Sequence, residues 1–177
     1  MSDKPERGPR LPPRWFIRLA WSVHRGLYRG HPWSGRTPAS EGQPLGTLRL
    51  TTTGRRTGRK HSVLIAYLED GPNLIAMAMN GWAHGEPAWW LNLQAHPDAT
   101  VDLLDGPRLV RARVAKGDER SRLWGRWRGI GAQLDAYAAL RSSETAVVVL
   151  EPQPEPAIDD LGVAQTTNRS AVPATRK

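Results

Sequence analysis

Short runs of hydrophobic residues fill the middle of the chain and predict β-strands. Leu48 and Leu50 alternate with polar neighbours, as in a strand with one buried face. The next two runs, SVLIAYL at 62–68 and NLIAMAM at 73–79, are apolar at successive positions, which predicts central strands buried on both faces. The intervening Asp70-Gly71 is typical of a tight hairpin.

The remaining patterns predict one more hairpin, two helical regions and a last strand. TVDLL at 100–104 and RLVRARVA at 108–115 flank a DGP turn, and TAVVVLE at 145–151 closes the fold. A short helix is expected over 87–97, and a second helical region from Asp118 to about Ser142, interrupted near Gly129. Antiparallel strands joined by tight turns predict an α+β fold with a small antiparallel β-barrel, not a doubly wound parallel sheet.

The ends of the chain have a different pattern. Between Pro13 and His31, apolar residues at helical spacing predict an amphipathic basic helix, and glycines and prolines over 30–46 predict a linker. Residues 1–13 and 152–177 are rich in charge or proline and predict disordered tails. We therefore expect one folded domain over 14–151.

Composition narrows the chemistry. The chain of 177 residues has no cysteine, which excludes disulfides, thiolate metal sites and cysteine nucleophiles and favours a reducing, cytoplasmic compartment. No apolar run approaches the ~18 residues of a spanning helix, and no secretory signal is expected. The five histidines lack metal-ligand spacing, so no metal is predicted. A net charge of +8 instead indicates a polyanionic partner.

The sequence TTTGRRTGRKHS at 51–62 concentrates positive charge at one turn. Threonine hydroxyls, glycine backbone amides and arginine guanidinium groups are suited to binding phosphate. The spacing is not that of a Walker loop, because Gly58 is followed by Arg59-Lys60. A solvated basic turn without a ligand is the alternative interpretation.

Three blocks occur in order and with consistent spacing: LTTTGRRTGRKHSVLIAYL, AMNGWAHGEPAWWLNLQAHPDATV and GDERSRLWGRW. Together, from about Trp15 to Pro152, they resemble the deazaflavin-dependent nitroreductase family of actinobacterial oxidoreductases. The resemblance implies a split β-barrel that binds coenzyme F420, whose phosphodiester and polyglutamate tail would rest on the basic turn.

Carried over by position, the resemblance implies phosphate contacts from Arg55, Arg56, Thr57, Gly58 and Arg59. Two nearby positions depart from the family pattern. His61 stands where the family usually has arginine, so its contact with phosphate should be weaker or dependent on pH. Leu64 stands where the family usually has proline, which would soften a wall beside the coenzyme ring.

The second block implies the ring site. Ala78, Met79, Asn80 and Gly81 correspond to the turn beside the flat ring, with Met79 and Trp82 making the pocket bulkier, although both residues also suit a protein core. Trp15, Trp82 and Tyr137 are the candidate substrate-pocket residues, and Tyr137 is the candidate catalytic residue. Trp89 and Asn92 suit structural roles, burial for the former and hydrogen bonds to backbone for the latter.

The function that follows is hydride transfer between reduced F420 and a flat, lipophilic acceptor such as a quinone, nitroaromatic or enone. A proton could come from Tyr137, His84 or solvent. Alternatives are an FMN-binding split barrel and a basic nucleic-acid-binding barrel, the latter disfavoured because the charge gathers at one turn. Residues 14–30 would either cap the barrel or rest on an anionic membrane at the inner face of the cell membrane. The assembly would be a monomer or homodimer.

Overall fold

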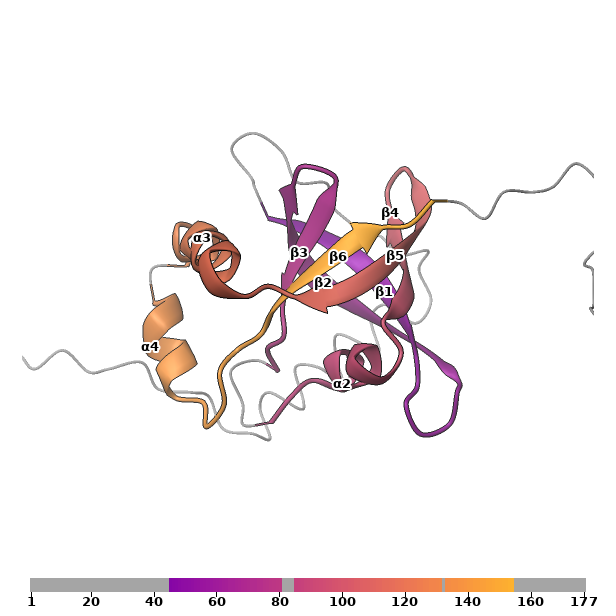
Figure 1. Ribbon diagram of the computed structural model, residues 1–177, viewed down its shortest axis with the longest axis horizontal. Helices are drawn as coiled ribbons and strands as arrows, with labels where there is room; N and C mark the ends of the chain where they lie inside the picture. Colours follow the sequence, from indigo (N-terminus) through magenta and orange to yellow (C-terminus); the bar gives the residue numbers. More distant parts are fainter. Residues whose placement is uncertain (1–44, 81–84, 132, 155–177) are drawn as a thin grey trace, which may run out of the picture.

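The computed structural model describes residues 45–80, 85–131 and 133–154. In chain order its elements are β1 (Gly46–Thr53), β2 (Lys60–Asp70), β3 (Asn73–Met77), α2 (Ala88–Ala95), β4 (Asp98–Leu103), β5 (Gly106–Val114), α3 (Gly117–Arg128), α4 (Leu134–Ala139) and β6 (Val147–Pro152). The strands form a closed barrel in the order β1-β2-β3-β6-β5-β4 (Figure 1). Pairing of β1 with β4 closes it, and every pairing is antiparallel. The α+β antiparallel barrel expected from the sequence is confirmed.

Both predicted hairpins are present, and in each the turn lies beside the predicted residues. Asp70 pairs with Asn73, so the β2–β3 turn is Gly71-Pro72, one residue beyond the predicted Asp70-Gly71, and Gly71 adopts a φ of 60°, which glycine allows without strain. In the second hairpin Leu103 pairs with Gly106, so the turn is Leu104-Asp105 and begins before the predicted DGP. Gly106, at a φ of 128°, already begins β5.

Strands β3 and β6 are buried on both faces because two hydrophobic clusters share them. Leu74, Ala76, Val148 and Leu150 face the barrel interior. The alternate residues of the same strands pack outside the barrel against α3 and α4 (Ile75, Met77, Val147, Val149, Leu123, Trp124, Trp127 and Leu134). We call this second set the outer cluster. The continuous apolar runs in the sequence follow from this two-sided burial.

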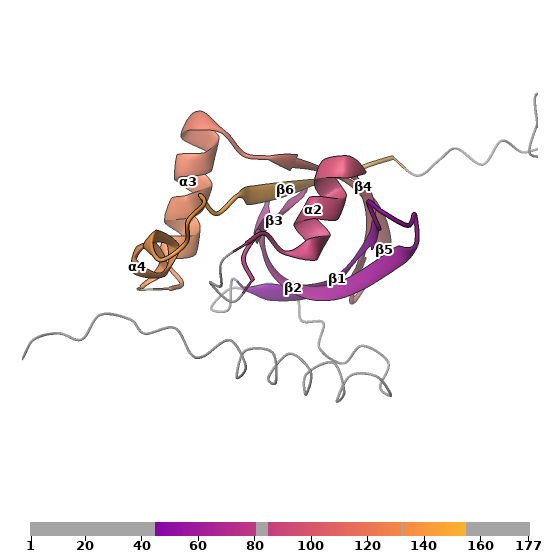
Figure 2. The same cartoon turned by 90° about the horizontal axis from the view of Figure 1, so that it is seen from below.

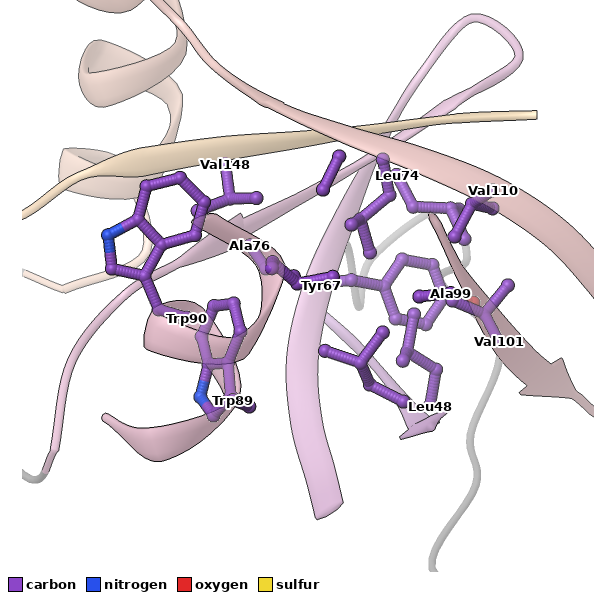
Figure 3. Close-up of a cluster of buried hydrophobic side chains, with 14 of the residues drawn as sticks. Leu48, Tyr67, Leu74, Ala76, Trp89, Trp90, Ala99, Val101, Val110 and Val148 are labelled. Carbon is purple, nitrogen blue, oxygen red and sulfur yellow. The ribbon is translucent and has the colours of Figure 1, made fainter. Parts of the chain in front are cut away.

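Helix α2 fills one end of the barrel. Viewed along the barrel, it lies across the opening (Figure 2). Trp89, Trp90 and Leu93 belong to the same cluster as Leu48 and Tyr67 of the barrel wall (Figure 3). The Trp89 and Trp90 rings meet edge to face, with centroids 6.4 Å apart. The predicted burial of Trp89 is confirmed, and the packing fixes α2 relative to the strands.

Ion pairs hold α3 against the barrel. Asp70, at the end of β2, accepts two hydrogen bonds from Arg122 at 2.8 Å and one from Arg126 at 2.9 Å. Arg113 of β5 binds Glu119 of α3 through two hydrogen bonds of 2.6 and 2.8 Å, and Glu151 of β6 through one of 2.6 Å. These forked contacts set the orientation of α3.

Several sequence predictions lie outside the described residues: the N-terminal helix over 14–30 with Trp15, the tail over 1–13, and Gly81, Trp82 and His84. Within the described part, Pro152 pairs with Val110, so β6 includes the first residue of the predicted C-terminal tail. None of the described helices is long and apolar enough to cross a membrane.

Candidate functional site

The basic turn connects β1 to β2 and is closed by its own backbone. Thr53 and Lys60 form the last pair of the two strands. Between them the Gly54 amide donates to the Arg59 carbonyl at 2.7 Å, and the Gly58 amide donates to the Gly54 carbonyl at 2.8 Å. Gly58 has a φ of 68°, a left-handed conformation that disfavours residues with a Cβ. Arg55, Arg56, Thr57, Gly58 and Arg59 are all exposed around this compact turn.

Within the described segments, the cations of this turn have no carboxylate partner, unlike most other basic residues there. Among the fourteen lysine and arginine residues of the described segments, nine pair with carboxylates (Arg49, Arg108, Arg111, Arg113, Arg120, Arg122, Arg126, Arg128 and Arg141). The other five are Arg55, Arg56, Arg59, Lys60 and Lys116. Four of these five lie at or beside one turn, so the local positive charge there is uncompensated.

A buried side chain of α2 anchors the turn. Asn92, which is 5% exposed, accepts hydrogen bonds from the Arg55 backbone amide at 3.2 Å and from its guanidinium at 3.4 Å. The Asn92 amide nitrogen donates to the hydroxyl of Thr52, which is fully buried, at 3.2 Å. Asn92 thus has the structural role expected of it, but its backbone partner belongs to the basic turn. The sequence did not predict this partner, because residues 55 and 92 are far apart in the chain.

His61 and Leu64, the two departures from the family pattern, occupy different places. His61 pairs with Thr52, and its ring lies over Gly54, where an added Cβ would be 2.8 Å from the ring atoms Cδ2 and Nε2. His61 therefore lies at the base of the basic turn and is exposed. Leu64 pairs with Arg49 farther along β2 and is half-buried.

Ala78, Met79 and Asn80 continue from the end of β3. The backbone amide of the fully buried Ala78 donates to Ala146 at 2.9 Å, and the Met79 amide donates to Met77 at 2.8 Å. Met79 packs against the outer cluster, as expected of a core residue, and Asn80 is exposed. We call residues 78–80 the second turn.

Tyr137 belongs to α4, on the opposite side of the barrel from the basic turn. It is half-buried on α4, and its neighbour Ala138 packs against the same outer cluster as Met79. Both views place α4 and the violet basic turn on opposite sides of the barrel (Figures 1 and 2). The predicted site residues therefore form two groups, and α2 runs between them.

Arg141 is a buried cation beside the second turn that the sequence did not single out. It follows α4, its side chain is completely buried, and it contacts the backbone of Ala78 and Gly85. The sequence predicted only that it lies near the end of a helical region. The only sequence signal is its place just before the buried strand β6, which is too weak to identify a buried cation. Over the described residues, no group of three or more histidine, aspartate or glutamate side chains could hold a metal ion.

Two curated proteins are similar to this chain in sequence. A protein of Mycobacterium tuberculosis, Rv3178, classed provisionally as an F420H(2)-dependent quinone reductase, is 32% identical over 117 residues, which are 63% of this chain and 93% of the relative. The F420H(2)-dependent quinone reductase Rv1261c of the same species is 30% identical over 95 residues, and the match spans 52% of this chain and 57% of that relative.

Solved structures support the barrel fold. An F420-H2-dependent reductase, FDR-A, superposes with a TM-score of 0.54 at 24% identity, covering 62% of this chain and 95% of that one. A domain-swapped dimer superposes with a TM-score of 0.56 at 23% identity, covering 77% and 98%. The family model for F420H(2)-dependent quinone reductases matches residues 28–152, and the chain belongs to that family.

Proposed function

We propose that this protein transfers a hydride between reduced coenzyme F420 and a quinone, and that the basic turn binds the anionic part of the coenzyme. This assignment of the turn is supported by Arg55, Arg56, Arg59 and Lys60, which form no ion pair with a carboxylate of the described residues. Exposed cations with no carboxylate partner are free to contact phosphate and glutamate carboxylates. The family membership supplies the identity of the coenzyme.

The residues of the turn fit an anionic ligand in geometry as well as in charge. The Gly54–Arg59 and Gly58–Gly54 hydrogen bonds hold the backbone in one shape, and Asn92 fixes Arg55 to the barrel. A pre-formed site of this kind loses little conformational entropy on binding. Arg55, Arg56, Thr57, Gly58 and Arg59 are therefore the proposed contacts for the phosphodiester, with His61 at the base of the turn.

The second group of residues is proposed to hold the ring and the acceptor. Ala78, Met79, Asn80 and Gly81 would lie beside the ring, Leu64 would contribute to its wall, and Trp15, Trp82 and Tyr137 would contact a flat lipophilic acceptor. The bound coenzyme supplies two-electron hydride chemistry. The protein has to orient the acceptor and exclude water, and Tyr137 is the proposed proton source.

The distribution of charge argues against a nucleic-acid-binding barrel. Outside the basic turn, Lys116 is the only lysine or arginine of the described segments without a carboxylate partner. Binding of single-stranded nucleic acid requires a row of unpaired cations along the strands. The surface formed by the described segments outside the basic turn has no such row. FMN, with one phosphate, would use fewer of the four cations than F420.

Fluorescence titration with oxidised F420, FMN and a single-stranded oligonucleotide tests the proposal. We expect F420 to bind most tightly, and Arg55→Ala with Arg56→Ala to weaken it by at least about tenfold, because charge-assisted hydrogen bonds are each worth roughly 1.5–3 kcal/mol. Arg108→Ala with Arg111→Ala removes the same charge from β5 and is the matched control. Tighter binding of FMN or oligonucleotide, or equal weakening in both double variants, would contradict the assignment.

Membrane association and assembly are proposals that need separate measurements. Residues 14–30 are proposed to contact anionic lipid, which flotation with anionic vesicles at low salt would detect. Failure of the protein to float would remove that role. Of the two assemblies expected, monomer and homodimer, we propose the homodimer; light scattering would detect it, and a monomeric mass would contradict it.

A further inference from the structure

The buried guanidinium of Arg141 contacts both the backbone that follows β3 and the backbone that precedes α2. Arg141 Nη1 donates to the carbonyl of Ala78 at 3.0 Å, and Nη2 donates to the carbonyl of Gly85 at 3.2 Å. Nη2 also lies 3.3 Å from Oε1 of Glu86, the residue before the N-cap of α2. The side chain therefore links the second turn to the start of α2.

The same guanidinium is tied to the start of β6. Nη1 donates to the buried Thr145 hydroxyl at 2.6 Å. The Thr145 residue is followed by Ala146, whose carbonyl accepts the Ala78 amide at 2.9 Å. Ala78 is thus held through its carbonyl by Arg141 and through its amide by the chain leading into β6. Its position is fixed from two directions.

This arrangement is costly as a source of stability alone. The Arg141 side chain is 0% exposed, and its Nε atom has no hydrogen-bond partner among the residues that the structure describes. Oε2 of Glu86 is also buried with no partner in the same part of the chain, although Ser143 donates to Oε1 at 3.1 Å. Well-packed hydrophobic side chains would stabilise such a position at least as well, because burying charge carries a large desolvation cost. A specific geometric role accounts better for a cation here.

We propose that Arg141 is a positioning residue that fixes the second turn, residues 78–80, against the start of α2. This inference rests on the proposed function, in which the second turn lies beside the coenzyme ring. We call the contacts of Arg141 with the second turn and with the start of α2 the clamp. Because α2 also carries Asn92, which binds Arg55, the clamp fixes the position of the second turn relative to the basic turn. Arg141 acts through backbone carbonyls, with no contact to the coenzyme required.

Hydrogen–deuterium exchange of the coenzyme-free protein tests the structural part of the proposal. Arg141→Lys keeps the charge, but an ammonium group cannot span four acceptors as a planar guanidinium does. We expect the amides of residues 79, 80, 85 and 86 to exchange at least tenfold faster, with β1, β4 and β5 unchanged. Arg128→Lys, at an exposed ion pair with Asp135, is the matched control. Unchanged exchange at these four residues, or equal acceleration throughout the barrel, would overturn the proposal.

Steady-state kinetics with F420H2 and a quinone test the functional part. Because the basic turn remains intact, Arg141→Lys should leave KM for the coenzyme within about threefold, while kcat falls at least about tenfold through misplacement of the ring. A rise in KM for the coenzyme with kcat unchanged would overturn the positioning role. Glu86→Gln, which keeps an acceptor oxygen, should show the same split in milder form and covers the case in which Arg141→Lys does not fold. If wild-type protein fails to bind F420, the proposed function fails, while the exchange measurement still tests the clamp.

Discussion

The side-chain oxygen of Asn92 accepts hydrogen bonds from both the backbone amide and the guanidinium of Arg55. Asn92 lies on the helix whose Trp89 and Leu93 pack into the barrel. The orientation of the basic turn is therefore set by the hydrophobic core and not by the turn alone. A loop with many exposed cations would otherwise sample many conformations, each binding an anion less well.

Replacing Asn92 by alanine should weaken F420 binding by roughly 5- to 30-fold, corresponding to about 1–2 kcal/mol for the lost hydrogen bonds. The change removes the acceptor for Arg55 and leaves the buried Thr52 hydroxyl without its donor. Titration with oxidised F420 measures the effect. Gln94→Ala, on the exposed face of the same helix, should bind like wild type. Equal affinities for Asn92→Ala and wild type would show that the anchor is unimportant.

Gly58→Ala should destabilise the basic turn by about 1–2 kcal/mol, the cost of a left-handed conformation for a residue with a Cβ. Gly58 has a φ of 68°, and an added Cβ would meet no atom within 4 Å, so strain in the backbone is the sole cause. Gly58→Asn should be milder because asparagine tolerates this region. Urea unfolding and F420 titration check both variants. A larger loss of stability for Gly58→Asn than for Gly58→Ala would contradict backbone strain as the cause.

The sequence predicted the barrel well because its central strands carry a physical signature. Val147 and Val149 pack outside the barrel while Val148 and Leu150 pack inside, and this two-sided burial requires an unbroken apolar run. The β2–β3 turn was predicted from Gly71 for a similarly local reason. In the β4–β5 hairpin, Gly106 also has a positive φ, but it is the first residue of β5. A prediction that places the turn at a glycine therefore places this turn too late in the chain.

The basic turn was also recognised locally, since its cations are consecutive. The contacts that orient it were not, because they join distant parts of the chain. The sequence predicted a structural role for Asn92 but not its partner, and it did not single out Arg141. Only the closed barrel brings Asn92 to Arg55 and Arg141 to Ala78. A polar or charged side chain that hydrogen-bonds a distant backbone group has no characteristic pattern in the sequence.

Two glycines outside the turns offer a matched test of the packing. At Gly46 a Cβ would lie 2.5 Å from ring atoms of the buried Tyr67, so Gly46→Ala should cost about 1–3 kcal/mol of stability through overpacking. At Gly125 in α3 a Cβ meets no atom within 4 Å, so Gly125→Ala should stabilise the protein by about 0.5–1 kcal/mol. Denaturant unfolding measures both. Similar stabilities for the two variants would contradict the packing of Tyr67 against Gly46.

The attachment of α3 to the β2–β3 hairpin should make stability depend on pH in the acid range. The hydrogen bonds from Arg122, followed by its charge and that of Arg126, lower the pKa of Asp70 below its ordinary value of 3.8. A carboxyl whose pKa is lower in the folded state stabilises the protein above its unfolded pKa. That contribution is lost as the pH falls through the lower, folded value. The difference in unfolding free energy between wild type and Asp70→Asn should therefore be constant near neutral pH and shrink below about pH 4.

A double-mutant cycle separates this ion pair from the general effect of acid on the other carboxylates. Asp70→Asn, Arg122→Ala and the combined variant are unfolded in urea at pH 7 and at pH 3. The coupling between the two residues should be favourable at pH 7 and smaller at pH 3, because below the ordinary pKa of 3.8 the unfolded state binds a proton that the ion pair in the folded state disfavours. Arg126 continues to contact Asp70 in the Arg122 variant, so the coupling reports the Arg122 contact alone. A coupling that is equal at both pH values would mean that α3 is held by packing of Leu123 and Trp127 on the outer cluster, and that the charge of Asp70 adds nothing to it.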